Sequence, residues 1–444
     1  MDIAPAHDHR SPSTTAGLRA PRPGLAAPAS PRLVVQTLDA TRRDQAARIW
    51  AGLLDQTGSD DLTTSWTWIS TWIDAFGDVV AHRFLVVTHD GAPVAIALAT
   101  RGQRQRRGML PVRTAHLGTD GEQGGVYIEY NRLLALPGHR AAALLALTAE
   151  IDRGWWRTDF VRLNGFAPEE LEGWEAPGFR LDRRVCRVVD LEAIRVGGQP
   201  LDKAFGSSIG RKLRKSSRVF AERYGPIATE WITDPARAQV VFGEMIELHQ
   251  ARWVAIGEPG SFASERLVRF HRALIDQLLP SGRVLLLRVT AGDHLVGVTY
   301  EFVEHGAILH YNWGLMAVQA NDGSLSPGFV TALALMREGL DRGYGEVNWL
   351  AGDSRWKREL STTTRDLVWA ERRTSPWATV VALSIRVKSR AAPMRSLLRT
   401  RVTAVANRLP SPTRSRARAG GEGASVASPD TRDPTSATGP EVHR

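Results

Sequence analysis

The stretch Leu285–Val303, "LLLRVTAGDHLVGVTYEFV", decides the fold, because its two apolar runs flank a Gly-Asp pair. Such a pattern predicts a β-hairpin with a tight turn. The stretch Phe84–Thr100, "FLVVTHDGAPVAIALAT", has the same form around Asp90-Gly91. At a constant offset of 202 residues, Val87-Thr88 falls on Val289-Thr290 without a gap. The hairpin is therefore expected to occur twice.

The resemblance between the two halves continues downstream of each hairpin. A predicted helix ends in Asp-Arg-Gly at residues 152–154 and leads into the strand "TDFVRLNGF", and the same tripeptide at 341–343 leads into "GEVNWLAGD". This ordered set indicates an internal duplication. We expect two similar α/β domains, at residues 32–195 and 196–375.

The remaining segments differ in composition from these two domains. Residues 1–31 are rich in Ala, Pro and Ser, and residues 409–444 are similar, so both are expected to be disordered. In residues 376–408 apolar positions recur at helical spacing with arginines mostly beside them, which predicts a basic amphipathic helical segment. Such a segment either packs on its own domain or makes peripheral contact with an anionic membrane.

Composition bounds the class of protein. Of the 444 residues, 43% are hydrophobic and 23% charged, which suits ordinary buried cores. There is no apolar run of membrane-spanning length and no signal-peptide pattern, so a cytoplasmic protein is expected, peripheral at the inner membrane face if the tail binds lipid. Cys186 is the only cysteine, which fits a reducing compartment. The twelve histidines show no metal-ligand spacing, so no metal is predicted.

The distribution of charge argues against nucleic acid as a partner. The formal net charge is +10, but residues 376–444 carry +8 and residues 1–31 carry +1, which leaves +1 for residues 32–375. A duplex-binding domain needs a basic face of its own. The positive charge belongs to the tail, and a small molecule or glycan is the expected partner of the folded body.

Three segments of the second half carry a family resemblance. Leu325–Gly343, "LSPGFVTALALMREGLDRG", is followed by Glu346–Ser361, "EVNWLAGDSRWKRELS", and preceded by the basic stretch Ser207–Gly225. Together they resemble the GNAT-like domain of the FemAB and CelD/BcsL (cellulose biosynthesis) group of acyltransferases, with Trp356 where tyrosine is usual. The resemblance implies an α/β (α+β) fold of two tandem GNAT-like domains, each a mixed, mostly antiparallel sheet with flanking helices.

The donor site is expected at the start of a helix. Ser326, Pro327 and Gly328 suit a helix N-terminus that receives a pyrophosphate, although an ordinary serine cap fits the same spacing. The resemblance implies acetyl-CoA or another acyl-CoA as co-substrate. The GNAT phosphate signature with its closely spaced glycines is absent here, so the donor stays open.

The stretch after the last predicted strand of this half supplies a second set of candidates. Asp353 and Lys357 lie four apart and share a face if a helix starts at residue 353 or 354. Lys357 would neutralise a donor phosphate or the developing oxyanion, and Asp353 would hold it or receive the amine. The alternative is an Asp cap with an ordinary ion pair. Trp356 is expected to contact substrate.

A predicted central strand at residues 307–314, "AILHYNWG", supplies further candidates for substrate binding. Strand alternation predicts that His310 and Asn312 share one face, with Tyr311 and Trp313 on the other. Either pair can line an acyl cleft, or simply fill the core. Glu301 is the predicted general base, provided that burial raises its pKa.

These expectations define a leading function and two alternatives. The leading one is an N-acyltransferase that moves an acyl group, most simply acetyl from acetyl-CoA, to an amine of a sugar, polysaccharide precursor or cell-envelope metabolite. The second domain would carry the chemistry. One alternative is an aminoacyl-tRNA-dependent ligase that builds peptide bridges, the only case in which nucleic acid is a partner. The other is a non-catalytic partner of a polysaccharide synthesis or export complex.

Overall fold

The computed structural model describes residues 33–102, 106–107, 110–120, 126, 129–152, 157–318 and 325–384. The two segments predicted to be disordered lie outside these residues. Of the predicted amphipathic segment, residues 376–384 form a helix and residues 385–408 lie outside the described part of the chain.

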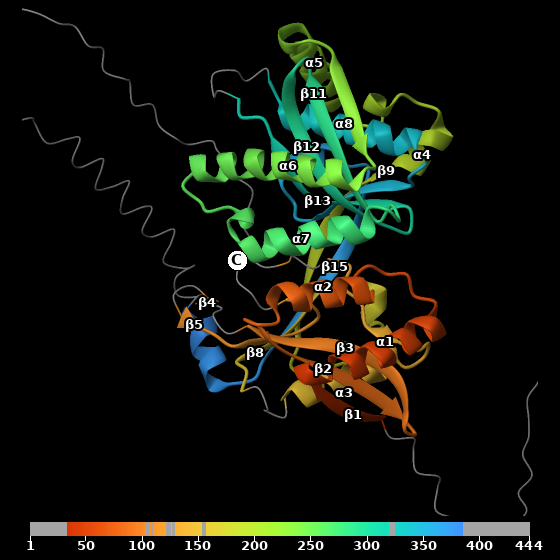
Figure 1. The fold of residues 1–444 in the computed structure, drawn as a ribbon, viewed down its shortest axis with the longest axis vertical. Coiled ribbons are helices and arrows are strands. Elements are labelled where there is room, and N and C mark those ends of the chain that lie inside the picture. Colours follow the sequence, from red (N-terminus) through yellow and green to blue (C-terminus); the bar gives the residue numbers. More distant parts are fainter. Residues whose placement is uncertain are drawn as a thin grey trace, which may run out of the picture. The chain divides into compact units, whose positions relative to one another are not determined.

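A single sheet runs through both halves of the protein in the order β1-β2-β3-β6-β8-β15-β9-β14-β13-β12-β11-β10 (Figure 1). In the first half, β7 pairs with β3, and β4 and β5 form a separate small pair. The elements of this half are β1 (Leu33–Asp39), α1 (Arg43–Thr57), α2 (Trp66–Phe76), β2 (Ala81–His89), β3 (Ala92–Gly102), β4 (Arg106–Arg107), β5 (Leu110–Pro111), β6 (Thr114–Leu117), β7 (Leu134–Ala135), α3 (Arg140–Asp152), β8 (Phe160–Phe166) and β9 (Arg180–Asp190).

After two leading helices, α4 and α5, the second half repeats the main order of the first: a strand, two helices, a hairpin, a strand, a helix and two strands. It contains α4 (Leu191–Gly197), α5 (Ser207–Tyr224), β10 (Ile227–Ile232), α6 (Pro235–Ala255), α7 (Glu265–Leu278), β11 (Val284–Ala291), β12 (His294–Glu304), β13 (Ala307–Leu315), α8 (Pro327–Asp341), β14 (Glu346–Ala351), α9 (Arg355–Glu359) and β15 (Thr363–Arg373). Most neighbouring strands are antiparallel, whereas β13–β14 and β6–β8 are parallel.

The predicted hairpins are β2–β3 and β11–β12, and they share a local irregularity. The register of the first shifts between Val87 and Thr88, and that of the second shifts between Val289 and Thr290, 202 residues later. A β-bulge inserts an extra residue at a fixed place, and two equivalent bulges are a specific sign of common architecture. The predicted fold class, a tandem of mixed sheets with flanking helices, is confirmed.

The last strand of each half pairs with strands of the other half. Strand β9 pairs with β14 of the second half, from Glu346↔Asp190 to Ala351↔Cys186. Strand β15 pairs with β8 of the first half and also with β9. Figure 1 shows β9 and β15 between the two sets of helices. The halves therefore exchange strands, and the predicted boundary near residue 195 stays a prediction.

Helices cover both faces of the second-half strands. Helices α6 and α7 bury one core together with Tyr300, and α5 and α8 bury the other together with Trp349. Helix α7 shows why the sequence folds this way: Ser264 caps it by accepting a hydrogen bond from the Leu267 N–H, and apolar positions three and four apart face the sheet. No helix among the described residues is long and apolar enough to cross a bilayer.

Helix α7 also buries a histidine whose protonation opposes folding. The two ring nitrogens of His271 lie 3.2 Å from the hydroxyls of Tyr300 and Tyr311. Complete burial lowers the pKa of His271 to about 3. Between pH ~6.5 and about pH 3, His271 therefore binds a proton in the unfolded chain but not in the folded protein.

We therefore expect the protein to become less stable as the pH falls. As pH falls through this window, His271 lowers the free energy of unfolding by up to ~1.4 kcal/mol per pH unit. Urea unfolding at several pH values should give a shallower acid slope for His271→Asn than for the wild type. The comparison of slopes is independent of the absolute stability lost by the variant. Equal slopes would contradict this role for His271.

Candidate active site

Strands β13 and β14 separate near the middle of the second half. Their parallel pairing covers only Ala307↔Glu346, Ile308↔Val347 and Leu309↔Asn348. Beyond this point β14 continues against β9 with a register shift between Asn348 and Ala351, and Leu350 adopts a positive φ of 60°. A bulge of this kind redirects side chains and ends pairing. The two strands thus diverge at His310, the residue that follows the last pair.

A buried carboxylate and a histidine lie at this point of divergence. Glu301 of β12 pairs in register with His310 of β13. The His310 Nδ1 lies 2.9 Å from Glu301 Oε1 and 3.1 Å from Oε2. The Glu301 side chain is 0% exposed and that of His310 only 6% exposed. Burial of both groups against each other fixes the orientation of the imidazole ring.

The predicted alternation along β13 is wrong, because the strand contains a bulge. The register changes from Tyr300↔Asn312 to Glu301↔His310, so Tyr311 is an extra residue without a partner in β12. Tyr311 packs against His271 at 4.7 Å between ring centroids, in the α7 core. Asn312 lies opposite Tyr300, and its side-chain oxygen accepts the N–H of Trp313. His310 thus shares its side of the sheet with Trp313 instead of Asn312.

Three tryptophans surround His310. The ring centroids of Trp313, Trp349 and Trp356 lie 4.7, 5.3 and 6.1 Å from that of His310. Trp313 and Trp356 also contact each other at 4.8 Å with their planes 37° apart. Such aromatic walls exclude water and strengthen electrostatic interactions between the groups they enclose. Of the predicted substrate-binding residues, the structure brings His310, Trp313 and Trp356 together.

The predicted donor site adjoins this cluster. Ser326 is the N-cap of α8 without a side-chain cap bond, and Pro327 occupies the first turn. A Cβ placed on Gly328 would lie 3.7 Å from the Trp313 ring, so the helix start reaches the tryptophans. A helix N-terminus favours anionic groups. The role of these three residues in donor binding stays a prediction.

Buried hydroxyls around the same cluster lack partners. Thr299 of β12, Thr331 of α8 and Ser354 before α9 each bury a side-chain oxygen that has no hydrogen-bond partner among the described residues. Thr299 lies opposite Trp313 in the register of β12 and β13. Unpaired buried hydroxyls are uncommon in folded proteins, and a bound ligand or water supplies the partner in many of them.

Asp353 and Lys357 do not form the predicted pair. Helix α9 begins at Arg355 after Ser354, so Asp353 precedes the helix. Its carboxylate accepts hydrogen bonds from Arg187 at 2.6 and 2.9 Å, which lower the pKa of Asp353. This side chain is about half exposed. The expected i,i+4 contact is absent because Asp353 lies outside the helical turn that carries Lys357.

Lys357 instead binds the end of β14. Its Nζ donates to the carbonyl of Ala351 at 2.7 Å and to that of Leu350 at 3.3 Å. Burial lowers the pKa of Lys357, while the charge of Glu129 opposes that shift. A lysine that holds two carbonyls at a bulge supports the geometry of the diverging strand. The structure thus places Lys357 beside Trp356 as a support of the site wall.

Two first-half residues complete this wall, and neither was among the predicted site residues. Glu129 accepts the N–H of Ala351 at 2.7 Å, and burial raises the pKa of this carboxyl group. The hydroxyl of Tyr130 accepts a hydrogen bond from the Asn348 side chain at 2.6 Å. These contacts join positions more than 200 residues apart, which local patterns do not reveal. The one local signal was an acidic residue, Glu129, between Ile128 and Tyr130.

The first half lacks the acid–histidine pair at the corresponding place. Strand β3 lies 202 residues before β12, so Ala99 corresponds to Glu301. The partner of Ala99 in β6 is Leu117. The Asn131 side chain donates to the Leu117 carbonyl at 3.0 Å, and Asn131 bridges to Phe166 of β8. Apolar and amide groups thus fill the position that the acid and histidine occupy in the second half.

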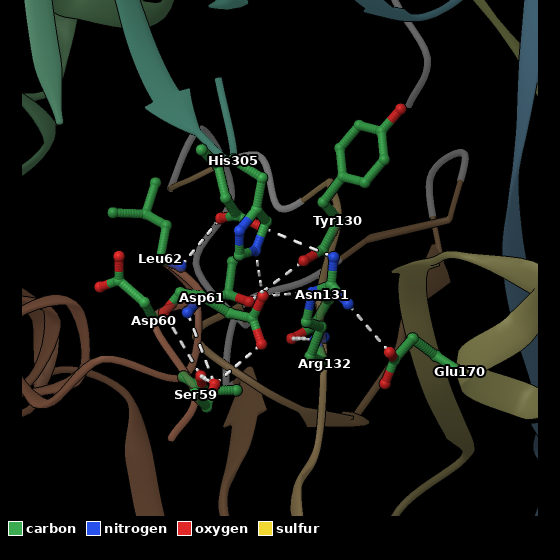
Figure 2. Close-up of polar contacts among 12 residues, drawn as sticks. Ser59, Asp60, Asp61, Leu62, Tyr130, Asn131, Arg132, Glu170 and His305 are labelled. Carbon is green, nitrogen blue, oxygen red and sulfur yellow. Dashed lines mark hydrogen bonds and ion pairs between the residues drawn. The ribbon is translucent and has the colours of Figure 1, made fainter. Parts of the chain in front are cut away.

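Close to Glu129 and Tyr130 in the chain, Arg132 is the centre of an ion-pair network that links the two halves (Figure 2). Arg132 lies 3.1 Å from Asp61, 3.0 Å from Glu170 and 3.6 Å from Glu304. His305 adds a contact of 2.9 Å to Asp61. Asp61, Glu304 and His305 are also close enough to share a metal ion. The guanidinium of Arg132 already supplies positive charge to the carboxylates of Asp61 and Glu304, so these groups form an ion-pair network without a metal ion.

Residues 207–358 match the family described as acetyltransferase (GNAT) domain. This segment includes β12, β13, α8 and β14, and so contains the Glu301–His310 pair and the three tryptophans. The second half therefore carries a GNAT acyltransferase domain, and the predicted enzyme class is confirmed.

Several solved structures are similar to the chain, each at low identity. FemX is 11% identical with a TM-score of 0.46, over 78% of this chain and 99% of FemX. L-PGS from Bacillus licheniformis is 13% identical with a TM-score of 0.45, over 76% of this chain and 96% of that chain. A tandem GNAT protein from the clavulanic acid biosynthesis pathway is 13% identical with a TM-score of 0.41, over 77% and 99%.

Similarity at this level says nothing about substrates. The comparison with curated proteins finds no match for this chain. The narrower relation to the FemAB or CelD/BcsL group stays a prediction.

Proposed function

We propose that the second half is an N-acyltransferase in which His310, held by Glu301, is the general base. The observation that carries this proposal is the buried hydrogen bond between the two side chains at the divergence of β13 and β14. A carboxylate that accepts from Nδ1 leaves Nε2 as the proton acceptor. Among the described residues no hydrogen-bond partner is found for His310 Nε2.

The reaction needs few protein groups. The amine nitrogen of the acceptor attacks the carbonyl carbon of the acyl thioester, a C–N bond forms and the C–S bond breaks. His310 takes the proton that the amine loses and returns it to the leaving thiolate. The tryptophans keep water from the thioester, and the start of α8 with Ser326 and Gly328 suits the donor's phosphates.

The donor and the acceptor are proposed from the family resemblance and not from the geometry of the site. Acetyl-CoA is the simplest acyl donor for a GNAT domain, and an amine of a sugar, polysaccharide precursor or cell-envelope metabolite is the proposed acceptor. Both assignments rest on the resemblance described above. Arg187 binds Asp353 outside the cluster, so we assign Asp353 no part in the proton transfer.

An acyl-transfer assay tests this proposal. Free thiol released from acetyl-CoA is measured over a panel of amines with the wild type, Glu301→Gln and the control His294→Gln. His294 is exposed at the turn of the same hairpin. We expect Glu301→Gln to lower kcat about tenfold or more, because glutamine no longer fixes the imidazole tautomer. The control should match the wild type.

Other outcomes separate the alternatives. A folded wild type that neither binds nor consumes acetyl-CoA at millimolar concentration contradicts the proposed donor. Turnover that requires charged tRNA favours the ligase. Turnover unchanged in Glu301→Gln removes the base assignment, and the absence of turnover with every donor supports the non-catalytic partner.

A further inference from the structure

The helix at residues 376–384, which follows β15, has two apolar faces. One of them is buried: Ala378 and Val381 are 0% exposed and pack with Val112 and Phe160 of the first half. A hydrogen bond from the Ser375 hydroxyl to Asp159 holds the start of the helix. These contacts fix the orientation of the helix on the protein.

The opposite face is exposed and uncharged. Trp377, Val380 and Leu383 are 39%, 50% and 53% exposed. Their spacing of three residues places them along one side of the helix. The chain carries no charged residue between Ser375 and Ile385. Large apolar side chains gathered on one exposed helix face mark an interaction surface more often than scattered ones do.

Trp377 is held in a fixed position within this face. Its indole Nε1 donates to the carbonyl of Pro111 at 2.9 Å. The polar end of the indole is therefore satisfied by the protein, while part of the ring stays exposed. An aromatic ring with one satisfied polar group suits the boundary between water and lipid.

Exposed arginines lie near the start of the helix, and the sequence that follows the helix is basic. From Arg386 to Arg418 the sequence contains ten Lys and Arg residues and no Asp or Glu. Within the described residues Arg113 and Arg157 are exposed close to the start of the helix. Asp159, which accepts the hydrogen bond from Ser375 at the helix start, is only 3% exposed and also pairs with Arg113. The charge around this face complements an anionic surface.

We propose that the exposed face of the helix at residues 376–384 docks this protein on an anionic lipid bilayer. Trp377, Val380 and Leu383 enter the boundary between headgroups and acyl chains, and the exposed Arg113 and Arg157 near the start of the helix meet the lipid headgroups. Apolar insertion and basic attraction together give the two signals that stable, reversible membrane binding needs. A second copy of the chain is the competing occupant.

Flotation of the full-length protein with vesicles tests the proposal. The vesicles are phosphatidylcholine alone or with about one third phosphatidylglycerol. The test variant replaces Trp377, Val380 and Leu383 with serine. The matched control replaces three exposed apolar residues with serine: Val240 and Val254 of α6, and Ile256, which directly follows that helix.

We expect the wild type and the control to float with anionic vesicles about tenfold more than with neutral ones, and less at high salt. The test variant should lose about nine tenths of this binding while circular dichroism shows that it is still folded at the assay temperature. Equal flotation of the test variant and the wild type overturns the proposal. A wild type that does not float but dimerises through these three residues also overturns it, in favour of contact between copies.

Because one face of this helix is buried, a substitution in it can disturb the fold. Two substitutions at one exposed position separate that effect from a loss of lipid contact. Val380→Glu places a negative charge on the exposed face alone and should reduce flotation, whereas Val380→Lys should preserve most of it. Equal loss in both variants would mean that the fold, and not the lipid contact, had changed, and would count against docking.

Discussion

Replacing His310 with glutamine is expected to lower kcat for acyl transfer by about 10²- to 10⁴-fold, the usual contribution of a positioned general base. The KM for the acyl donor should change little, because no donor contact is removed. Glutamine fills similar space between Trp313 and Trp349 and can still bond Glu301, so the wall of the site should persist. Steady-state kinetics with acetyl-CoA and an accepted amine measures both constants.

The matched control for this variant is His294→Gln, on the exposed turn of the same hairpin. It makes the same chemical change outside the cluster and should keep wild-type kinetics. A His310→Gln enzyme with kcat within about threefold of the wild type would exclude His310 as the base. A rise in KM at constant kcat would instead assign His310 to substrate binding.

Replacing Arg132 with methionine is expected to cost about 3–5 kcal/mol of unfolding free energy. The change leaves Asp61, Glu170 and Glu304 without the cation that they share. Glu170 and Glu304 are nearly buried, and burial raises the pKa of both carboxyl groups. Urea unfolding monitored by circular dichroism at pH 8 gives the loss.

The pH dependence of this loss has a definite sign. Without Arg132 the two glutamate pKa values should rise further, so the folded variant binds protons that the unfolded chain releases above pH ~4.5. Acidification toward pH 5 should therefore narrow the gap between variant and wild type. The control Arg237→Met breaks a half-exposed ion pair with Glu230 and should cost under about 1 kcal/mol. A similar cost for both variants would contradict the role of Arg132.

Local patterns were sufficient to predict the repeated elements of the fold. Gly-Asp and Asp-Gly turns between alternating apolar runs predicted both hairpins, and the 202-residue offset holds in the coordinates down to the bulges. Turn residues and the alternation of side chains act over a few residues, so a single sequence is enough to predict the hairpins. The pairing of β9 and β15 with the opposite half depends on contacts far apart in sequence, and no local pattern reports it.

The sequence predicted which residues form the candidate site better than it predicted how they are arranged. Glu301, His310, Trp313 and Trp356 were all named from the sequence, and the structure places them together. Simple alternation failed at Tyr311, because a bulge adds one residue and reverses the faces beyond it. The predicted pairing of Asp353 with Lys357 is wrong because the helix starts at Arg355, after the start at residue 353 or 354 that the contact requires.

The exchange of β9 and β15 means that neither half can complete its own part of the sheet. A fragment that stops after the first half would expose the edge of β8, where β15 normally lies, and unpaired edges invite aggregation. Translation must reach β15 before the earlier half is finished, so both halves should unfold as one cooperative unit. The two similar halves therefore depend on each other to complete their folds.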